Sequence, residues 1–261
     1  MFGPNFFVYL AWKGQRDDAK VRTFASIMHL SPYDAKVMLG APGPRKVAAH
    51  VKLEEAERQT LELRKAGFTA IIIDKQKFSR APALFRAVRA VETPKGMTFS
   101  LERLPDFELA KGAARAVVLG YYTEATRHTD NLGPRGLVQT IASTTRVRNP
   151  FIHVYSDDVD TILDIRGPKF ECAWLEGEGA LPSDQRWQKL AGRLSAYYDT
   201  FMDDTLFRYP DEVGAITAAL NVSADSGRGF TASVGGQALV DDTPVALAAS
   251  RVIVECLVYG I

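Results

Sequence analysis

The sequence has 261 residues, of which 46% are hydrophobic and 24% are charged, so it can form one large domain or two ordinary ones with a sizeable core. Its two cysteines are far apart and lack the spacing of a metal site, which favours reduced thiols in a cytoplasmic protein. The most apolar stretch, residues 245–261, carries Arg251 and Glu255, so we expect no membrane span, and the N-terminus lacks the pattern of a signal peptide.

Charge is distributed unevenly along the chain, although the net charge is only +1. Residues 1–100 contain 17 Lys and Arg against 9 Asp and Glu, whereas residues 151–261 contain 8 against 17. A basic head and an acidic rear should attract each other, within one molecule or between molecules. Most basic side chains of the head are expected opposite helix acids or on solvated faces, so nucleic acid is a less favoured partner than protein.

Residues 1–77 predict a small domain in which strand, helix, helix, strand, helix and strand follow one another. The first strand is rich in aromatic and branched side chains, and the first and last helices carry apolar residues at helical spacing. Ser31-Pro-Tyr-Asp34 combines a capping hydroxyl, a first-turn proline and an acidic residue, which together begin a helix that ends near Gly40. We expect strands over 6–12, 45–51 and 68–74, and the outer helices over 18–29 and 53–66.

Several short motifs in this segment fit one known domain. Together with the order of elements, they resemble the C-terminal domain of the bacterial ribosomal stalk protein and, less closely, the Clp protease adaptor that shares its fold. This resemblance implies docking onto other proteins rather than catalysis. In the stalk family, basic residues of the first helix contact translation factors, and Lys20 stands at one such position. The matching pieces are Ala19-Lys-Val, Leu30-Ser-Pro-Tyr-Asp-Ala-Lys36, Leu53-Glu-Glu-Ala and Ala66-Gly67.

Residues 83–220 predict a second domain of short strands that ends in an amphipathic helix capped by Ser183. Antiparallel strands followed by one helix are similar in architecture to a pleckstrin-homology domain. The polar segment 133–149 is expected to be a loop or insertion. The predicted fold class is therefore α+β, with a small β-α-α-β-α-β domain followed by a mostly antiparallel β barrel or sheet with a packed C-terminal helix.

The end of the chain predicts two further segments. Residues 221–242 are rich in Ser, Gly and Ala, as in a linker. Residues 243–261 are apolar and are expected to dock onto this chain or onto a partner. Their spacing fits a helix, while their Val and Ile residues also permit a buried strand, and both alternatives stay open.

We find no motif for a reaction or a cofactor, so the leading hypothesis is a non-enzymatic adaptor or scaffold component of a bacterial complex. It would bind a protein partner or a second copy of itself. Contacts are expected from basic side chains of the head and from the apolar C-terminal segment. The candidate partner-binding residues are Lys13, Arg16, Lys20, Arg22, Arg45, Lys46, Val252, Cys256 and Tyr259.

Two alternatives assign other functions. A metal-dependent hydrolase could use Asp157-Asp158-Val-Asp160, because carboxylates two residues apart can share a hard cation, although such a run is also common in solvated turns. Alternatively, the basic head could bind nucleic acid. His153 alternates with Ile152 and Val154, so we expect it to line a sheet face rather than to act as a base.

Overall fold

The computed structural model describes residues 3–11, 14, 17–78, 80, 82–132, 139–156, 160–166, 170–172, 183–217, 220, 238–241 and 243–258. Its helices are α1 (Asp18–Met28), α2 (Pro32–Leu39), α3 (Leu53–Lys65), α4 (Lys75–Phe78), α5 (Ser183–Tyr198), α6 (Thr205–Arg208), α7 (Glu212–Thr217) and α8 (Thr243–Val258). Its strands are β1 (Phe6–Leu10), β2 (Arg45–His50), β3 (Ala70–Asp74), β4 (Ala83–Thr93), β5 (Gly96–Leu101), β6 (Leu104–Ala110), β7 (Ala116–Leu132), β8 (Gln139–Tyr155), β9 (Thr161–Arg166), β10 (Glu171–Cys172), β11 (Phe201–Asp203) and β12 (Ala238–Asp241).

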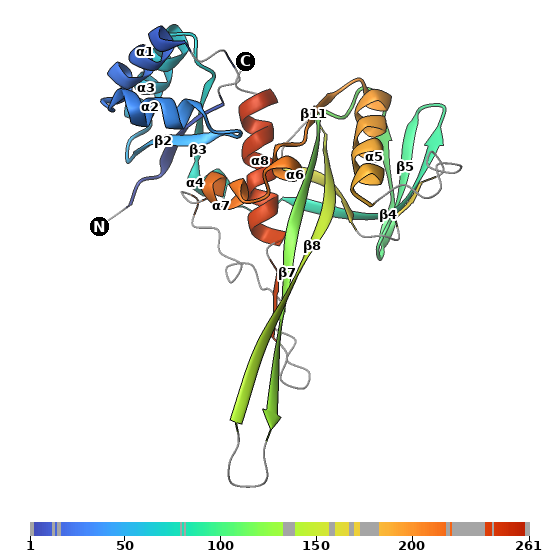
Figure 1. The fold of residues 1–261 in the computed structure, drawn as a ribbon. Helices are drawn as coiled ribbons and strands as arrows, with labels where there is room; N and C mark the ends of the chain where they lie inside the picture. Colours follow the sequence, from blue (N-terminus) through green and yellow to red (C-terminus); the bar gives the residue numbers. More distant parts are fainter. Residues whose placement is uncertain are drawn as a thin grey trace.

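The N-terminal unit has the predicted order of elements, with bounds within two residues of those expected. Its three strands form an antiparallel sheet in the order β2-β1-β3, and helices α1 to α3 cover one face of that sheet (Figure 1). The helix starts follow the local signals in the sequence. The Asp17 carboxylate accepts a hydrogen bond from the backbone N–H of Lys20, and the Ser31 hydroxyl accepts one from that of Asp34 at 3.1 Å.

The second sheet confirms the α+β class and is not closed into a barrel, so of the two expected alternatives, barrel or sheet, the structure has the open sheet. Its strands follow the path β11-β7-β8-β9-β4-β5-β6, with β10 beside β4 and β12 beside β7. Most pairs are antiparallel, but β4 runs parallel to both β9 and β10, and β7 runs parallel to β11. Since β11 and β6 lie at opposite ends of this path and do not pair, the sheet stays open.

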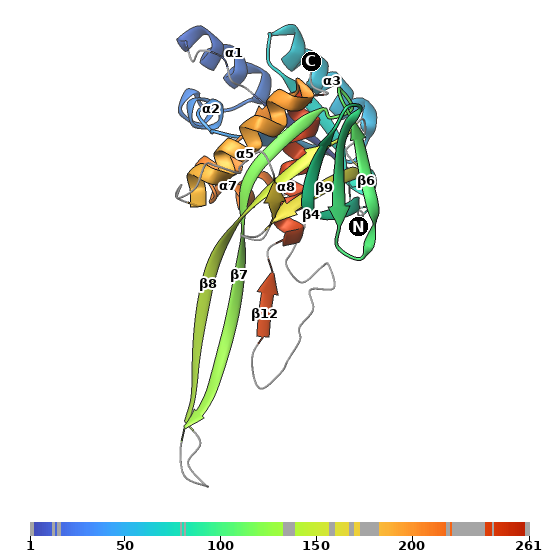
Figure 2. The same ribbon diagram turned by 90° about the vertical axis from the view of Figure 1, so that its right-hand side faces the viewer.

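A long two-stranded ribbon projects from this sheet. Strands β7 and β8 pair over 17 residues each and extend well beyond the helices (Figures 1 and 2). Residues 139–149, expected in a loop, belong to β8, where Thr140, Ile141 and Val147 supply the branched side chains that strands favour. The predicted linker 221–242 also contains a strand, since β12 pairs antiparallel with β7 (Figure 2).

The apolar C-terminal segment is helical from Thr243 to Val258, which decides between the two alternatives for its structure. Helix α8 lies between the small sheet and the large one (Figure 1). Its residues from Ala248 to Val254 are all buried, so it is covered on every side. It packs against Tyr9 and Ile73 of the small sheet and against Tyr155 of the large sheet. Helix α5 covers the opposite face of the large sheet.

The N-terminal unit and the large sheet therefore share a hydrophobic core around α8, in addition to the core that each forms on its other face. Polar contacts join the same parts. The Tyr9 hydroxyl donates to the backbone carbonyl of Ile216 at 2.7 Å, and Arg45 forms an ion pair with Glu212 of α7. We infer that residues 1–77 and the large sheet unfold together, because each contributes one wall of the core around α8.

Two glycine substitutions should change stability in opposite directions. A Cβ at Gly120 of β7 would lie 2.6 Å from the Phe151 ring and 2.8 Å from Leu206, so Gly120→Ala should cost about 1–3 kcal/mol. A Cβ at Gly192 of α5 would meet nothing within 4 Å, and Gly192→Ala should stabilise by about 0.5–1 kcal/mol. Urea unfolding followed by circular dichroism measures both changes. Equal effects of the two substitutions would contradict the packing of α6 on β7.

Candidate functional site

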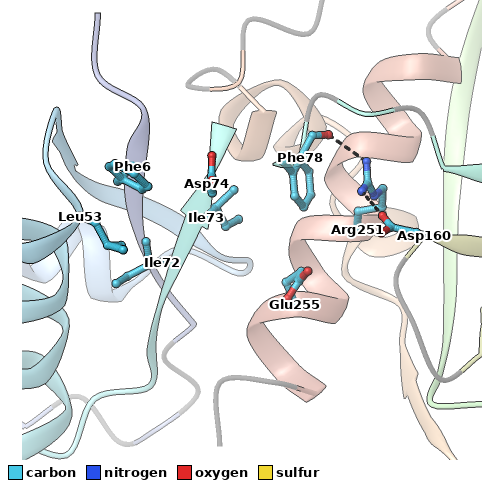
Figure 3. Close-up of a pocket in the computed structure, with 9 residues that line it drawn as sticks. All are labelled: Phe6, Leu53, Ile72, Ile73, Asp74, Phe78, Asp160, Arg251 and Glu255. Carbon is cyan, nitrogen blue, oxygen red and sulfur yellow. Dashed lines mark hydrogen bonds and ion pairs between the residues drawn. The ribbon is translucent and has the colours of Figure 1, made fainter. Parts of the chain in front are cut away.

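Two cavities open at the outer edge of β3 and form one groove. The first, of about 260 Å³, lies between β3 and α8 (Figure 3), and the second, of about 500 Å³, lies between α3 and β3. They share Ile72 and Glu255. We call this the β3 groove, and its lining residues are Phe6, Leu53, Glu57, Thr60, Leu61, Arg64, Ile71, Ile72, Ile73, Asp74, Phe78, Asp160, Arg251 and Glu255.

The groove follows the edge of a sheet rather than one of its faces. Strand β3 pairs with β1 on one side, and no other strand in the described part of the chain pairs with it. Ile71 packs in the core around α8, whereas Ile72 packs on the opposite face, against the helices of the N-terminal unit. Because both line the groove, the groove lies where the two faces meet, along the free edge of β3.

Apolar side chains of α3 form one wall of the groove. Helix α3 turns Ala56, Thr60 and Leu63 toward the core of the N-terminal unit. Leu53 and Leu61 flank this inner stripe, and they remain 41% and 53% exposed. Exposed apolar side chains that line a concave surface are typical of sites that contact other proteins.

Charged side chains make the groove electronegative. Four carboxylates and two guanidinium groups line it, so its formal charge is negative even though the surrounding N-terminal segment is basic. One of the guanidinium groups, that of Arg64, donates to the backbone carbonyl of Ala70 at 2.8 Å and so lies at one end of the β3 edge. The carboxylates belong to Glu57, Asp74, Asp160 and Glu255.

Helix α8 forms one wall of the groove, and Arg251 fixes its position there (Figure 3). Its guanidinium donates to the backbone carbonyls of Phe78 at 2.9 Å and Arg80 at 3.1 Å, and to the Asp160 carboxylate at 2.8 Å. The same group stacks over the Phe78 ring, 4.4 Å from its centroid. The Arg251 side chain is only 5% exposed, so these contacts fix α8 to the chain that follows β3.

Four of the basic residues that the sequence singled out are described, and they lie on α1 and β2. The Lys20 ammonium donates to the carbonyl of Ala66 at 2.7 Å, at the C-terminal end of α3, and Arg45 is held by Glu212. Arg22 and Lys46 are exposed, on α1 and β2 respectively. Lys13, Arg16 and Tyr259 lie outside the described residues.

Val252 and Cys256 have no exposed surface. Both side chains pack in the core around α8, so the apolar contact expected of the C-terminal segment is made within the chain. As a correction to the sequence analysis, the folded chain leaves neither side chain accessible to a partner. The residue near the end of the same helix that lines the groove is Glu255, which is half-buried and which the apolar pattern could not reveal.

The predicted acidic cluster is described only at Asp160, since Asp157 and Asp158 lie outside the described residues. Asp160 forms the ion pair with Arg251. In the part of the chain that the structure describes, no three His, Cys, Asp or Glu side chains gather closely enough to hold a metal ion.

A second polar cluster is buried in the large sheet. His153 of β8 lies on the face that carries Phe151 and Tyr155, as its alternation predicts, and its Nε2 is 3.5 Å from the Asp164 carboxylate. The Arg166 Nε is 2.6 Å from the same carboxylate. Burial lowers the pKa of His153, against the opposing effect of Asp164. Burial alone would raise the pKa of Asp164, but His153 and the Arg166 guanidinium outweigh it and lower that pKa.

Comparisons with protein families, with curated protein sequences and with solved structures found no match to this chain. None of the described helices combines the length and the apolar character that crossing a bilayer requires. The candidate site therefore depends on the geometry of the β3 groove, which brings together residues from three distant parts of the sequence.

Substitutions at the Arg251–Asp160 pair should have unequal effects on stability. Arg251→Met leaves two backbone carbonyls without their donor and should cost about 2–4 kcal/mol. Asp160→Asn removes only a carboxylate that is 56% exposed, and should cost less than about 1 kcal/mol. Urea unfolding of both variants measures the difference. Similar losses would show that the ion pair, rather than the carbonyl contacts, anchors α8.

Acid should destabilise the protein through His153. Its pKa is lower in the folded state than in the unfolded state, so the unfolded chain binds more protons as the pH falls below about 6.5, and stability decreases there by up to about 1.4 kcal/mol per pH unit. Asp164, whose pKa is also lowered, contributes only below its unfolded value, about 3.9. Urea unfolding at pH 7.5 and 5.5 should show a reduced slope in His153→Phe. His29→Asn, at an exposed histidine, is the control and should retain the slope.

Proposed function

We propose that this chain is a non-enzymatic adaptor that holds a segment of a partner protein in the β3 groove. The observation that carries this proposal is the coincidence of three features along β3: a free sheet edge, an exposed apolar wall and a concave surface. Each of these features is common by itself, but together they provide what an extended or helical segment needs in order to bind.

Charge favours a partner segment that carries Lys or Arg. The groove is lined by more carboxylates than guanidinium groups, so a cationic segment would be attracted and a nucleic-acid backbone would be repelled. In addition, Lys20 and Arg45 of the basic head already make contacts within the chain, which lowers their availability to phosphates.

The resemblance of residues 1–77 to the ribosomal stalk domain supports the same class of function, because that family and the Clp adaptor act by docking onto other proteins. The buried free thiol of Cys256 is compatible with a reducing compartment. The proposal therefore places the chain in a bacterial cytoplasmic complex, with the partner bound on the α3 side of the N-terminal unit.

Site-specific photo-crosslinking in the native host tests the proposal. A benzophenone amino acid at Leu61, which is half-exposed in the groove, should give one discrete protein adduct. The same group at Tyr33, which is 76% exposed on α2 and does not line the groove, is the matched control and should not give that adduct. Mass spectrometry then identifies the crosslinked segment, which should be rich in Lys or Arg.

A charge reversal provides the second arm of this experiment. Glu255→Lys should reduce the yield of the Leu61 adduct several-fold, because it removes a carboxylate from the groove and introduces a cation. Circular dichroism checks that the variant is folded. Adducts of equal yield from Leu61 and Tyr33, or an adduct with an acidic segment, would rule out the groove as the binding site.

A further inference from the structure

The backbone of β3 has hydrogen-bonding groups that point into the groove. In an antiparallel pair, the N–H and C=O groups of successive residues alternate between the partner strand and the other side. Ala11 N–H bonds to Thr69 C=O, and Lys75 N–H bonds to Asn5 C=O, so the odd-numbered residues of β3 face β1. The backbone groups of Ile72 must then face away from β1. In the part of the chain that the structure describes, β1 is the only strand that pairs with β3, so these groups lack a strand partner.

We propose that a partner segment binds as a fourth strand of the small sheet, paired with β3 at Ile72. This inference rests on the proposed function and specifies how the segment is held. The edge spans Ala70 to Asp74, about 17 Å at 3.3–3.4 Å per residue, which matches four to five residues of an extended chain. At one end of the edge, Arg64 already occupies the carbonyl of Ala70, so pairing is centred on Ile72.

The two sides of the added strand would meet different environments. Side chains that point toward α3 contact the wall of Leu53, Leu61 and Ile72, which also carries Glu57. Side chains that point toward α8 contact Glu255, beside the Arg251–Asp160 pair. Because side chains alternate along a strand, the structure predicts a segment in which apolar residues alternate with Lys or Arg.

A second copy of this chain is a less suitable occupant. The other edge of the small sheet is β2, and pairing of β2 from one copy with β3 of another joins two different surfaces. Such a head-to-tail contact does not close on itself and leads to filaments unless the rotation closes a ring. Antiparallel pairing of β3 with β3 of a second copy would close as a two-fold dimer, but it would bring two electronegative grooves together. The occupant is therefore a segment of another protein.

Labelled peptides test this inference on the full chain. The probe is a five-residue peptide with blocked ends in which Val at the first, third and fifth positions alternates with Lys, and its binding is followed by fluorescence anisotropy. Two control peptides have one change each: a block arrangement of the same residues, and a proline at the central position, which removes a backbone donor. We expect the alternating peptide to bind at least ten-fold more tightly than either control, and its affinity to decrease as salt rises.

The amide of Ile72 gives a direct reading of strand pairing. In hydrogen exchange resolved by NMR, its protection should rise at least ten-fold when the alternating peptide binds, while the amide of Tyr33 on α2 should not change. Leu61→Asp and Glu255→Lys should each weaken binding at least five-fold, whereas Val37→Asp, at an exposed apolar residue of α2, should not.

The results separate this inference from the proposed function. If Leu61 crosslinks a partner in the host but the alternating and proline peptides bind equally, or the Ile72 amide stays unprotected, strand addition is overturned and the adaptor proposal stands. If the crosslink is absent as well, both are overturned. Self-association of the chain that Glu255→Lys abolishes, without peptide binding, would also overturn the inference.

Discussion

The burial of α8 on all sides is the constraint on which the rest of the structure depends. A helix with residues 248–254 wholly buried needs apolar surface around its whole circumference, and a single sheet covers only one side of it. The small sheet supplies one wall with Phe7, Tyr9 and Ile73, and the large sheet supplies the other with Tyr155 and Ile162. The small sheet is thereby fixed with one face on α8 and the other under α1 to α3. Its strand edges are the parts left uncovered, and the β3 edge lies between α3 and α8.

The N-terminal unit could be predicted from the sequence because its signals are local. Ser31 and Asp34 lie three residues apart, and the N–H of Asp34 bonds to the Ser31 hydroxyl as the capping pattern requires. Gly67 adopts a φ of +80° directly after α3, where the sequence places the end of that helix. A helix start or end of this kind is determined by neighbouring residues, so the tertiary fold leaves it unchanged. His153 is a similar case, since its place on a sheet face follows from simple alternation.

The large sheet and the groove could not be predicted, because both depend on residues far apart in the chain. The parallel pairing of β4 with β9 joins segments that are about eighty residues apart, and no local pattern specifies that partner. The part of β8 over residues 139–149 was missed because polar residues predominate there, a composition that is typical of loops. The groove combines Leu61 on α3, Ile72 on β3 and Glu255 on α8. One sequence signal was available, namely that Leu61 lies off the buried stripe of its helix, but nothing in the sequence indicated that β3 would be an edge strand.

The uneven charge of the chain is used partly within the molecule. Arg45 of the basic head forms an ion pair with Glu212 of the acidic rear, so these two halves of the chain are joined by opposite charges. A second ion pair, between Arg251 and Asp160, lies within the acidic rear and holds α8. The basic head nevertheless presents an electronegative groove, because Glu255 and Asp160 belong to the acidic rear and lie at its rim. The net charge of a hundred-residue segment attracts or repels other molecules only within about the Debye length, which is about 8 Å at physiological salt. Recognition depends instead on the charged groups that a ligand touches directly. The sign of a segment's net charge is therefore a poor guide to its partner, and the preference for cations that we propose rests on the carboxylates that line the groove.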